Sequence, residues 1–101
     1  RAHLRWVVPY DEDPLLDALA RLGAAGSLAL GEGTRYAGSF RAHGRSVPVW
    51  DLPVGPGAQA WEEPAAAFGS RLEEALAASG PLSSEERRAR DGLRGRQLTL
   101  R

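Results

Sequence analysis

Strand-like and helical segments follow one another in this chain of 101 residues in an order that limits the folds available to it. Residues 4–8 are rich in aromatic and β-branched side chains and stop at Pro9, which predicts a strand. Asp13 suits the N-cap of a helix whose first residue would be Pro14. Leucines at helical spacing predict the buried stripe of that helix: Leu15, Leu16, Leu19 and Leu22.

The middle of the chain has the period of a β-hairpin. Side chains alternate along residues 36–41 and again along 47–50, and His43 and Gly44 lie at the turn, where Gly tolerates a positive φ angle. Pro48 cannot donate a backbone hydrogen bond. We therefore expect the second hairpin strand at an edge of the sheet, or with the nitrogen of Pro48 turned away from a neighbouring strand.

Two helical segments follow the hairpin. The first begins at Pro64, and three of its apolar side chains share one face: Phe68, Leu72 and Leu76. The second is rich in arginine and runs to about Leu93. Ser83 and Glu86 at its start match a capping box, in which each residue bonds to the backbone of the other. Residues 97–100 have the pattern of a last strand or a docked tail.

The order β-α-β-β-α-α predicts an α+β fold. We expect a small sheet of three to four strands that includes the β-hairpin, with helices packed mainly on one of its faces. Residues 1–101 leave room for one hydrophobic core and therefore for a single domain. Because the chain begins at Arg1 and enters a strand almost at once, we expect it to be the C-terminal part of a longer protein.

Chemical groups that carry catalysis or hold metals are scarce. The chain has no Cys and no Lys, which removes thiolate nucleophiles, thiolate zinc ligands and Schiff-base chemistry. Its 13 Arg balance 13 Asp and Glu, so the net charge gives no global attraction to nucleic acid or to an anionic membrane. We expect no cofactor, no metal site and no contact with a membrane, and we expect a cytoplasmic location.

Several segments resemble a known protein family. They are residues 4–9, 15–22, 30–35, 40–44, 47–52, 81–82, 85–90 and 98–101. They are similar to the C-terminal domain of an uncharacterised actinobacterial family. Longer members carry an N-terminal SecC-type cysteine motif that binds zinc, and some are labelled SecA-like. The resemblance implies a bacterial cytoplasmic protein that continues N-terminal to this chain. It assigns no catalytic residue, and no zinc site in a chain without Cys.

Arginines concentrate near the C-terminus. Residues 83–101 carry six Arg against three acidic residues, a net charge of +3. The candidates for contact with an anion or with nucleic-acid phosphates are Arg87, Arg88, Arg90, Arg94, Arg96 and Arg101. The alternative that we favour is a solvated helix with ion pairs between side chains four residues apart, such as Glu86 and Arg90.

Trp61 lies where a loop meets a helix, and it is the candidate anchor for a protein interface. Trp6 and Trp50 lie on strands, and we expect both in the core. His43 and Asp51 are the residues that an enzyme site completed elsewhere could use. Neither has a nucleophile beside it in the sequence.

The favoured function is that of a non-enzymatic accessory or protein-interaction domain. Its partner would be the N-terminal remainder of its own chain or another protein, and we expect an exposed apolar patch near Trp61 or at the open edge of the sheet. One alternative is a nucleic-acid or ribosome-associated module that uses the Arg-rich C-terminal helix. The other is part of an enzyme whose site is completed by residues N-terminal to this chain.

Overall fold

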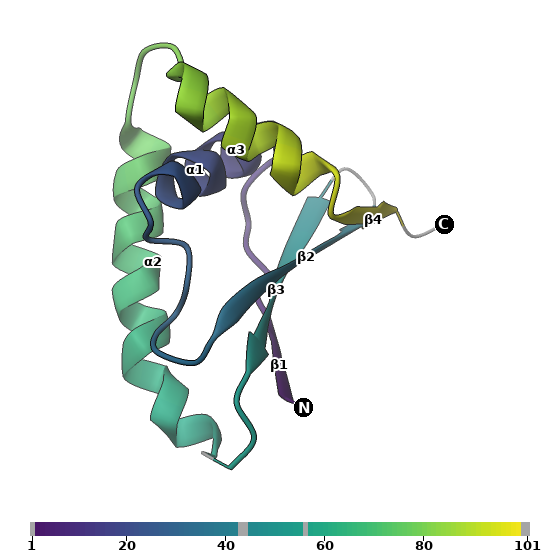
Figure 1. The fold of residues 1–101 in the computed structure, drawn as a ribbon, viewed down its shortest axis with the longest axis vertical. Coiled ribbons are helices and arrows are strands. Elements are labelled where there is room, and N and C mark those ends of the chain that lie inside the picture. Colours follow the sequence, from purple (N-terminus) through teal and green to yellow (C-terminus); the bar gives the residue numbers. More distant parts are fainter. Residues whose placement is uncertain (1, 43–44, 56, 100–101) are drawn as a thin grey trace.

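Within residues 2–42, 45–55 and 57–99, which the computed structural model describes, a mixed four-stranded sheet packs against three α-helices (Figure 1). The elements are β1 (Ala2–Arg5), α1 (Glu12–Ala24), β2 (Arg35–Ala42), β3 (Arg45–Leu52), the short 3₁₀ helix η1 (Ala58–Trp61), α2 (Glu62–Ala77), α3 (Ser84–Arg94) and β4 (Gln97–Thr99). The predicted order of strands and helices is confirmed, and β4 follows it as a further strand.

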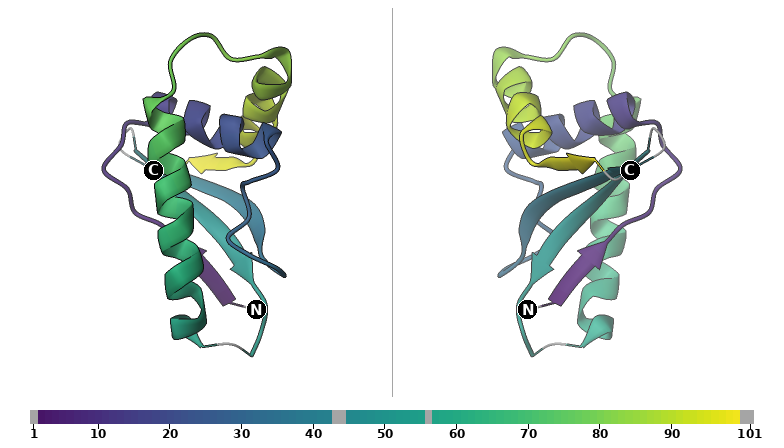
Figure 2. Two further views of the ribbon diagram at one scale, coloured as in Figure 1. Left: turned by 90° about the vertical axis from the view of Figure 1, so that its left-hand side faces the viewer. Right: turned by 90° about the vertical axis from the view of Figure 1, so that its right-hand side faces the viewer.

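The helices lie on one side of the sheet. The strand order is β1-β3-β2-β4, in which β4 runs parallel to β2 and the other neighbours are antiparallel. α1 packs against both α2 and α3. The right-hand view of Figure 2 shows the strands in front of α2, with no described helix over their near face. This is the α+β arrangement that the sequence predicts.

Aromatic rings join the helices to the sheet. Trp50 of β3 is fully buried, and its ring meets Phe68 of α2 and Tyr36 of β2 edge-on, with centroids 5.0 and 5.3 Å away. Trp6 packs at the margin of this group, 5.5 Å from Phe68. The indole N–H of Trp50 donates to the Leu28 carbonyl oxygen at 2.8 Å, so the buried polar atom is satisfied. The leucine stripe of α1 is buried in the same core, as predicted: Leu15, Leu16, Leu19 and Leu22.

β3 is a central strand, so the edge position expected for Pro48 is wrong, and its nitrogen faces the side of the sheet on which β1 lies. The Pro48 carbonyl oxygen accepts a hydrogen bond from the Trp6 N–H at 2.9 Å. The nitrogen and oxygen of a strand residue point to the same side, so the Pro48 nitrogen faces the position just beyond β1. Its missing N–H ends the β1–β3 ladder. This explains why β1 ends at Arg5 and does not span the apolar residues 4–8.

α1 begins two residues earlier than predicted. Its N-cap is Asp11. Pro14 is the third residue of the helix. A backbone N–H at this position has no intrahelical partner, so the missing N–H of proline removes no hydrogen bond. The helix ends just before Gly26, which adopts a φ of 74°. The Ser27 N–H then donates to the Leu22 carbonyl oxygen at 2.8 Å, which closes a Schellman motif.

A β-bulge at Ala37 divides β2 into two parts that present opposite faces. Tyr36 and Gly38 pair with consecutive residues of β3, so Ala37 is the extra residue. Tyr36 faces the helices, whereas Phe40, which an uninterrupted alternation would place beside it, lies on the other face. The regular alternation predicted for residues 36–41 is therefore wrong after Ala37.

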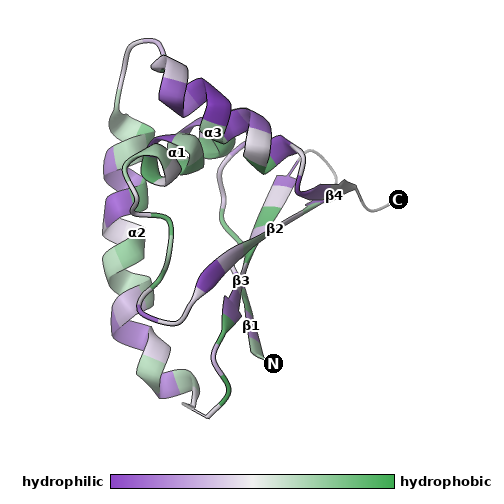
Figure 3. Ribbon diagram, in the orientation of Figure 1, coloured by the Kyte–Doolittle hydropathy of each residue, from purple (hydrophilic) through white to green (hydrophobic). Residues whose placement is uncertain are grey.

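The capping box at the start of α3 is confirmed. The Ser83 hydroxyl accepts from the Glu86 N–H at 3.1 Å, and the Glu86 carboxylate accepts from the Ser83 N–H at 2.8 Å. α3 is a strongly hydrophilic helix (Figure 3). It buries Leu93 and ends at Arg94. The chain then enters β4 at Gln97, so the last segment is a strand.

Candidate functional site

The face of the sheet without helices gathers side chains from three strands. Pro48, Trp50 and Leu52 of β3 point into the core, so the alternate residues Val47, Val49 and Asp51 point the opposite way, and their cross-strand partners share that side. We call this surface the open face. It is defined by His3, Arg5, Arg35, Phe40, Val47, Val49 and Asp51.

The open face is hollowed beside the bulge in β2. The cavity has a volume of about 260 Å³, and Gly38 forms part of its wall. The side chains around it include His3, Arg5, Phe40, Val49, Asp51 and Arg96. This volume lies below the usual range of small-molecule pockets, so the cavity suits one side chain of a partner or a small anion.

Arg96 reaches this cavity because the chain that leads into β4 passes directly over Gly38. The Ser39 N–H donates to the Arg96 carbonyl oxygen at 3.3 Å. A Cβ at Gly38 would lie 2.5 Å from the same oxygen, and the φ of 148° at this residue also favours glycine. The Arg96 guanidinium then lies 5.3 Å from the centre of the Tyr36 ring and donates to the Tyr36 carbonyl oxygen at 3.4 Å.

Positive charge dominates the open face. The Arg5 guanidinium lies over the Phe40 ring, 5.8 Å from its centroid, which is a cation–π distance. Arg35 pairs with Asp51 through a contact of 3.1 Å. Arg96 also lines the cavity, and its guanidinium packs on the Tyr36 ring. Among the described side chains that define the open face or line its cavity, Asp51 supplies the negative charge, so cations outnumber anions.

His3 and Asp51 form a close polar pair on the open face. Nδ1 of His3 lies 2.9 Å from Oδ1 of Asp51, and the two side chains are 47% and 14% exposed. A carboxylate that orients a histidine can serve acid–base catalysis, which bears on the enzyme alternative. Ser39 lines the same cavity, but it pairs with Pro48 and so faces the helix side, as Tyr36 does. The residues that define the open face therefore supply no hydroxyl nucleophile to this pair.

Burial raises the pKa of Tyr36 above its ordinary value of 10.0, because the surrounding core disfavours the phenolate. The hydrogen bond with Ser39 and the charge of Arg96 lower the pKa, and neither outweighs burial. Tyr36 is therefore a neutral phenol whose ring and carbonyl oxygen hold the Arg96 guanidinium.

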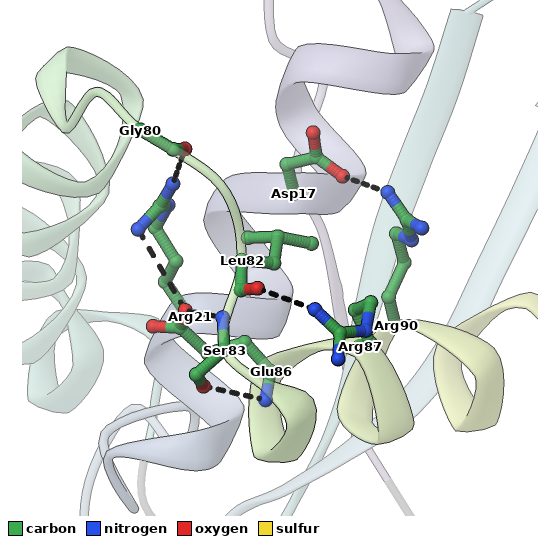
Figure 4. A network of polar contacts seen from close by, with 8 residues as sticks. All are labelled: Asp17, Arg21, Gly80, Leu82, Ser83, Glu86, Arg87 and Arg90. Atoms are coloured by element: carbon green, nitrogen blue, oxygen red, sulfur yellow. Dashed lines mark hydrogen bonds and ion pairs between the residues drawn. The ribbon is translucent and has the colours of Figure 1, made fainter.

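Arg90, one of the predicted anion contacts, holds α3 against α1 (Figure 4). Its guanidinium lies 3.0 Å from a carboxylate oxygen of Asp17. On the same interface Arg21 of α1 lies 3.7 Å from the Glu86 carboxylate and donates to the Gly80 carbonyl oxygen at 2.9 Å. Glu86 and Arg90 thus each pair with α1, which corrects the expectation that they pair with one another.

The other predicted arginines are divided between two surfaces. Arg87 donates to the Leu82 carbonyl oxygen at 2.8 Å and so closes the turn before α3. Arg88 and Arg94 are exposed on α3. Arg96 lies past the end of the helix, where it lines the cavity of the open face and also a hollow beside α3. Of the described arginines of the C-terminal segment, Arg96 is thus the one that reaches the open face.

Trp61 is half-buried where η1 meets α2. A Cβ at Gly31 would lie 3.7 Å from its ring, so Trp61 packs over the loop that precedes β2. The large apolar side chains that are exposed in the described part of the chain are Val7 and Val54, at 80% and 79%. The role of Trp61 as an interface anchor stays a prediction.

No local pattern in the sequence points to the open face. His3 and Asp51 meet because β1 and β3 pair in one particular register, and Arg5 meets Phe40 only because the bulge turns Phe40 over. The sequence signal that could have identified these residues is the alternation of side chains along each strand, which indicates those that share a face. Two earlier candidates, His43 and Arg101, lie outside the described residues.

Metal binding and membrane crossing find no support in the described part of the chain. There, no three side chains of the His, Asp or Glu type gather in a way that could hold a metal ion. None of the described helices has the length and apolarity that crossing a membrane requires.

The profile of a protein family described as "Family of unknown function (DUF5926)" matches residues 1–101, which is the whole chain. Comparison with curated proteins and with solved structures gave no significant match.

Proposed function

Since the chain belongs to DUF5926, a family of unknown function, we propose from the geometry of the open face that this is a non-enzymatic interaction domain. Its partner is an acidic segment of polypeptide that lies on the open face. The segment belongs either to the N-terminal remainder of the same chain or to another protein. In keeping with the resemblance noted above, we place the protein in the actinobacterial cytoplasm, with a SecC-type motif in its longer relatives.

One arrangement supports this function. Apolar Phe40 and Val49 line the cavity, Arg5 lies beside them as a cation, and Arg96 lines it as well. Apolar centres bordered by arginine are typical of protein interfaces. A carboxylate on the partner would form charge-assisted hydrogen bonds with a guanidinium, and the side chain that carries it would fill the cavity.

Nucleic acid is a poorer match for this surface. Proteins that hold single strands on a sheet stack bases on exposed aromatic rings. Here the Arg5 guanidinium already covers the Phe40 ring. On α3, Arg90 is engaged with Asp17 and Arg87 with the Leu82 carbonyl oxygen, which leaves Arg88 and Arg94 as exposed cations without such a contact. A polypeptide with carboxylates therefore fits the observed charges better than stacked bases do.

The test measures binding of three probes to the 101-residue chain by fluorescence anisotropy. The first probe is a capped peptide of alternating glutamate and valine, the second has lysine in place of glutamate, and the third is single-stranded oligouridylate. We expect binding of the acidic peptide alone. Binding of oligouridylate in preference to it would overturn the proposal and favour the nucleic-acid alternative.

Matched charge reversals locate the surface. Arg5→Glu combined with Arg96→Glu should weaken binding of the acidic peptide at least about tenfold, because it replaces attraction by repulsion at the cavity. Arg88→Glu combined with Arg94→Glu changes the net charge by the same amount on α3 and should leave binding nearly unchanged. Equal losses from both pairs would mean that the peptide senses only net charge, and the open face would then not be the site.

A further inference from the structure

We propose that the acidic segment binds as an additional β-strand along the outer edge of β1. This inference rests on the proposed function, since it specifies how the open face holds its partner. The segment would pair with the backbone of His3 and Arg5, and its carboxylates would meet the side chains of the same two residues.

β1 is an edge strand with a definite set of free backbone groups. It pairs with β3 on one side, and in the described residues no strand pairs with its other side. The bond from the Trp6 N–H to Pro48 sets the phase of the ladder. Backbone groups alternate in an antiparallel pair, so Leu4 bonds to β3, while the N–H and carbonyl groups of His3 and Arg5 point away from the sheet.

The same two residues also present their side chains on the open face. His3 is paired with Asp51 and Arg5 with Val49, and both partners point away from the core. A strand added to β1 would place alternate side chains on that face, within about 5 Å of their cross-strand neighbours. Carboxylates at these positions would lie opposite the imidazole and the guanidinium. Backbone pairing and charge pairing would thus occur at the same residues.

The charge of β1 determines which strands it accepts. Short edge strands with charged side chains normally discourage pairing with other sheets. β1 is four residues long, and its open-face side chains are basic or neutral in character rather than acidic. Arg5 would therefore repel a basic strand and attract an acidic one, which makes the edge selective. Val7, 80% exposed just beyond Arg5, offers an apolar contact to the end of the added strand.

Amide hydrogen exchange of the unmodified 101-residue chain tests this inference directly. The probe is the capped peptide of alternating glutamate and valine. We expect the amides of His3 and Arg5 to exchange at least about tenfold more slowly when the peptide is bound, because they become hydrogen-bonded. The Leu4 amide, which already bonds to β3, should change little. Binding of the peptide without protection at His3 and Arg5 would overturn strand addition.

Proline substitution separates backbone pairing from side-chain contact. His3→Pro removes an N–H that points away from the sheet, so the β1–β3 ladder keeps its own bonds. His3→Ala is the matched control, since it also removes the imidazole but keeps the N–H. We expect His3→Pro to bind the peptide at least about tenfold more weakly than His3→Ala does.

The outcomes distinguish the two proposals. Equal binding by His3→Pro and His3→Ala, together with loss of binding in the Arg5→Glu and Arg96→Glu variant, would overturn strand addition and leave the interaction function standing. Absence of any binding by the acidic peptide would overturn both.

Discussion

Gly38 of β2 lies so close to the backbone of Arg96 that a methyl group at this position would sit 2.5 Å from the Arg96 carbonyl oxygen. The contact joins β2 to the segment that leads into β4, and it holds Arg96 beside the cavity of the open face. One glycine thus supports both the edge of the sheet and a proposed partner contact.

Replacement of Gly38 by alanine should destabilise the fold by about 1–3 kcal/mol, because the φ of 148° is strained for any residue with a Cβ and the new methyl would displace β4. The free energy of unfolding in urea measures the change. Gly92→Ala is the control, since a Cβ there meets nothing within 4 Å and alanine favours the helix. An unchanged stability in Gly38→Ala would contradict the close contact.

Loss of the Ser83 hydroxyl should weaken α3. Ser83→Ala removes the acceptor of the Glu86 N–H and should cost about 1 kcal/mol of unfolding free energy. Ser84→Ala provides the comparison, because this neighbouring serine is already inside the helix and its change should have little effect. Urea titrations of the two variants should therefore differ, and equal midpoints would argue against the capping box.

The ion pair between Arg90 and Asp17 should contribute a small coupling energy. Both side chains are partly exposed, at 28% and 43%, so solvent screens their attraction. We expect about 0.5 kcal/mol from a double-mutant cycle of Arg90→Ala and Asp17→Ala. The same cycle with Arg88→Ala and Asp17→Ala should give no coupling. A coupling that persists for Arg88 would show that the effect is not specific to the observed pair.

Stability should fall at alkaline pH through Tyr36. Its pKa in the folded state is raised above 10.0, mainly by burial. Below that pH both states hold the proton and the free energy of unfolding is unaffected. As pH rises past 10.0 the unfolded chain releases the proton before the folded one does, so stability declines until the folded pKa is passed.

Tyr36→Phe tests this linkage. Urea unfolding at a series of pH values on both sides of 10.0 should show a steeper alkaline decline for the original chain than for the variant. Parallel declines would mean that Tyr36 is not the group responsible.

Helices were the most predictable part of the fold. The leucine stripe of α1 and the capping box of α3 depend on residues three or four positions apart, and such contacts form within the helix itself. The start of α1 was less predictable, because its N-cap is Asp11, two residues before the Asp13 that the sequence indicated.

Strands were predictable as elements but not in their bounds or faces. The apolar pattern of residues 4–8 indicated β1, yet Pro48 of the neighbouring strand ended it at Arg5. The bulge at Ala37 inverted the second half of β2. Both effects come from the partner strand, which a local pattern does not contain.

The sequence by itself determined the α+β order, the helical faces and the scarcity of catalytic groups, because composition and short-range periodicity are properties of the chain alone. Tertiary structure decided which charges meet. The register of β1 and β3 places His3 beside Asp51, and the segment after α3 places Arg96 beside Gly38. The packing of α3 on α1 places Arg90 beside Asp17. These pairs join residues far apart in the sequence, and only the folded backbone sets the distance between them.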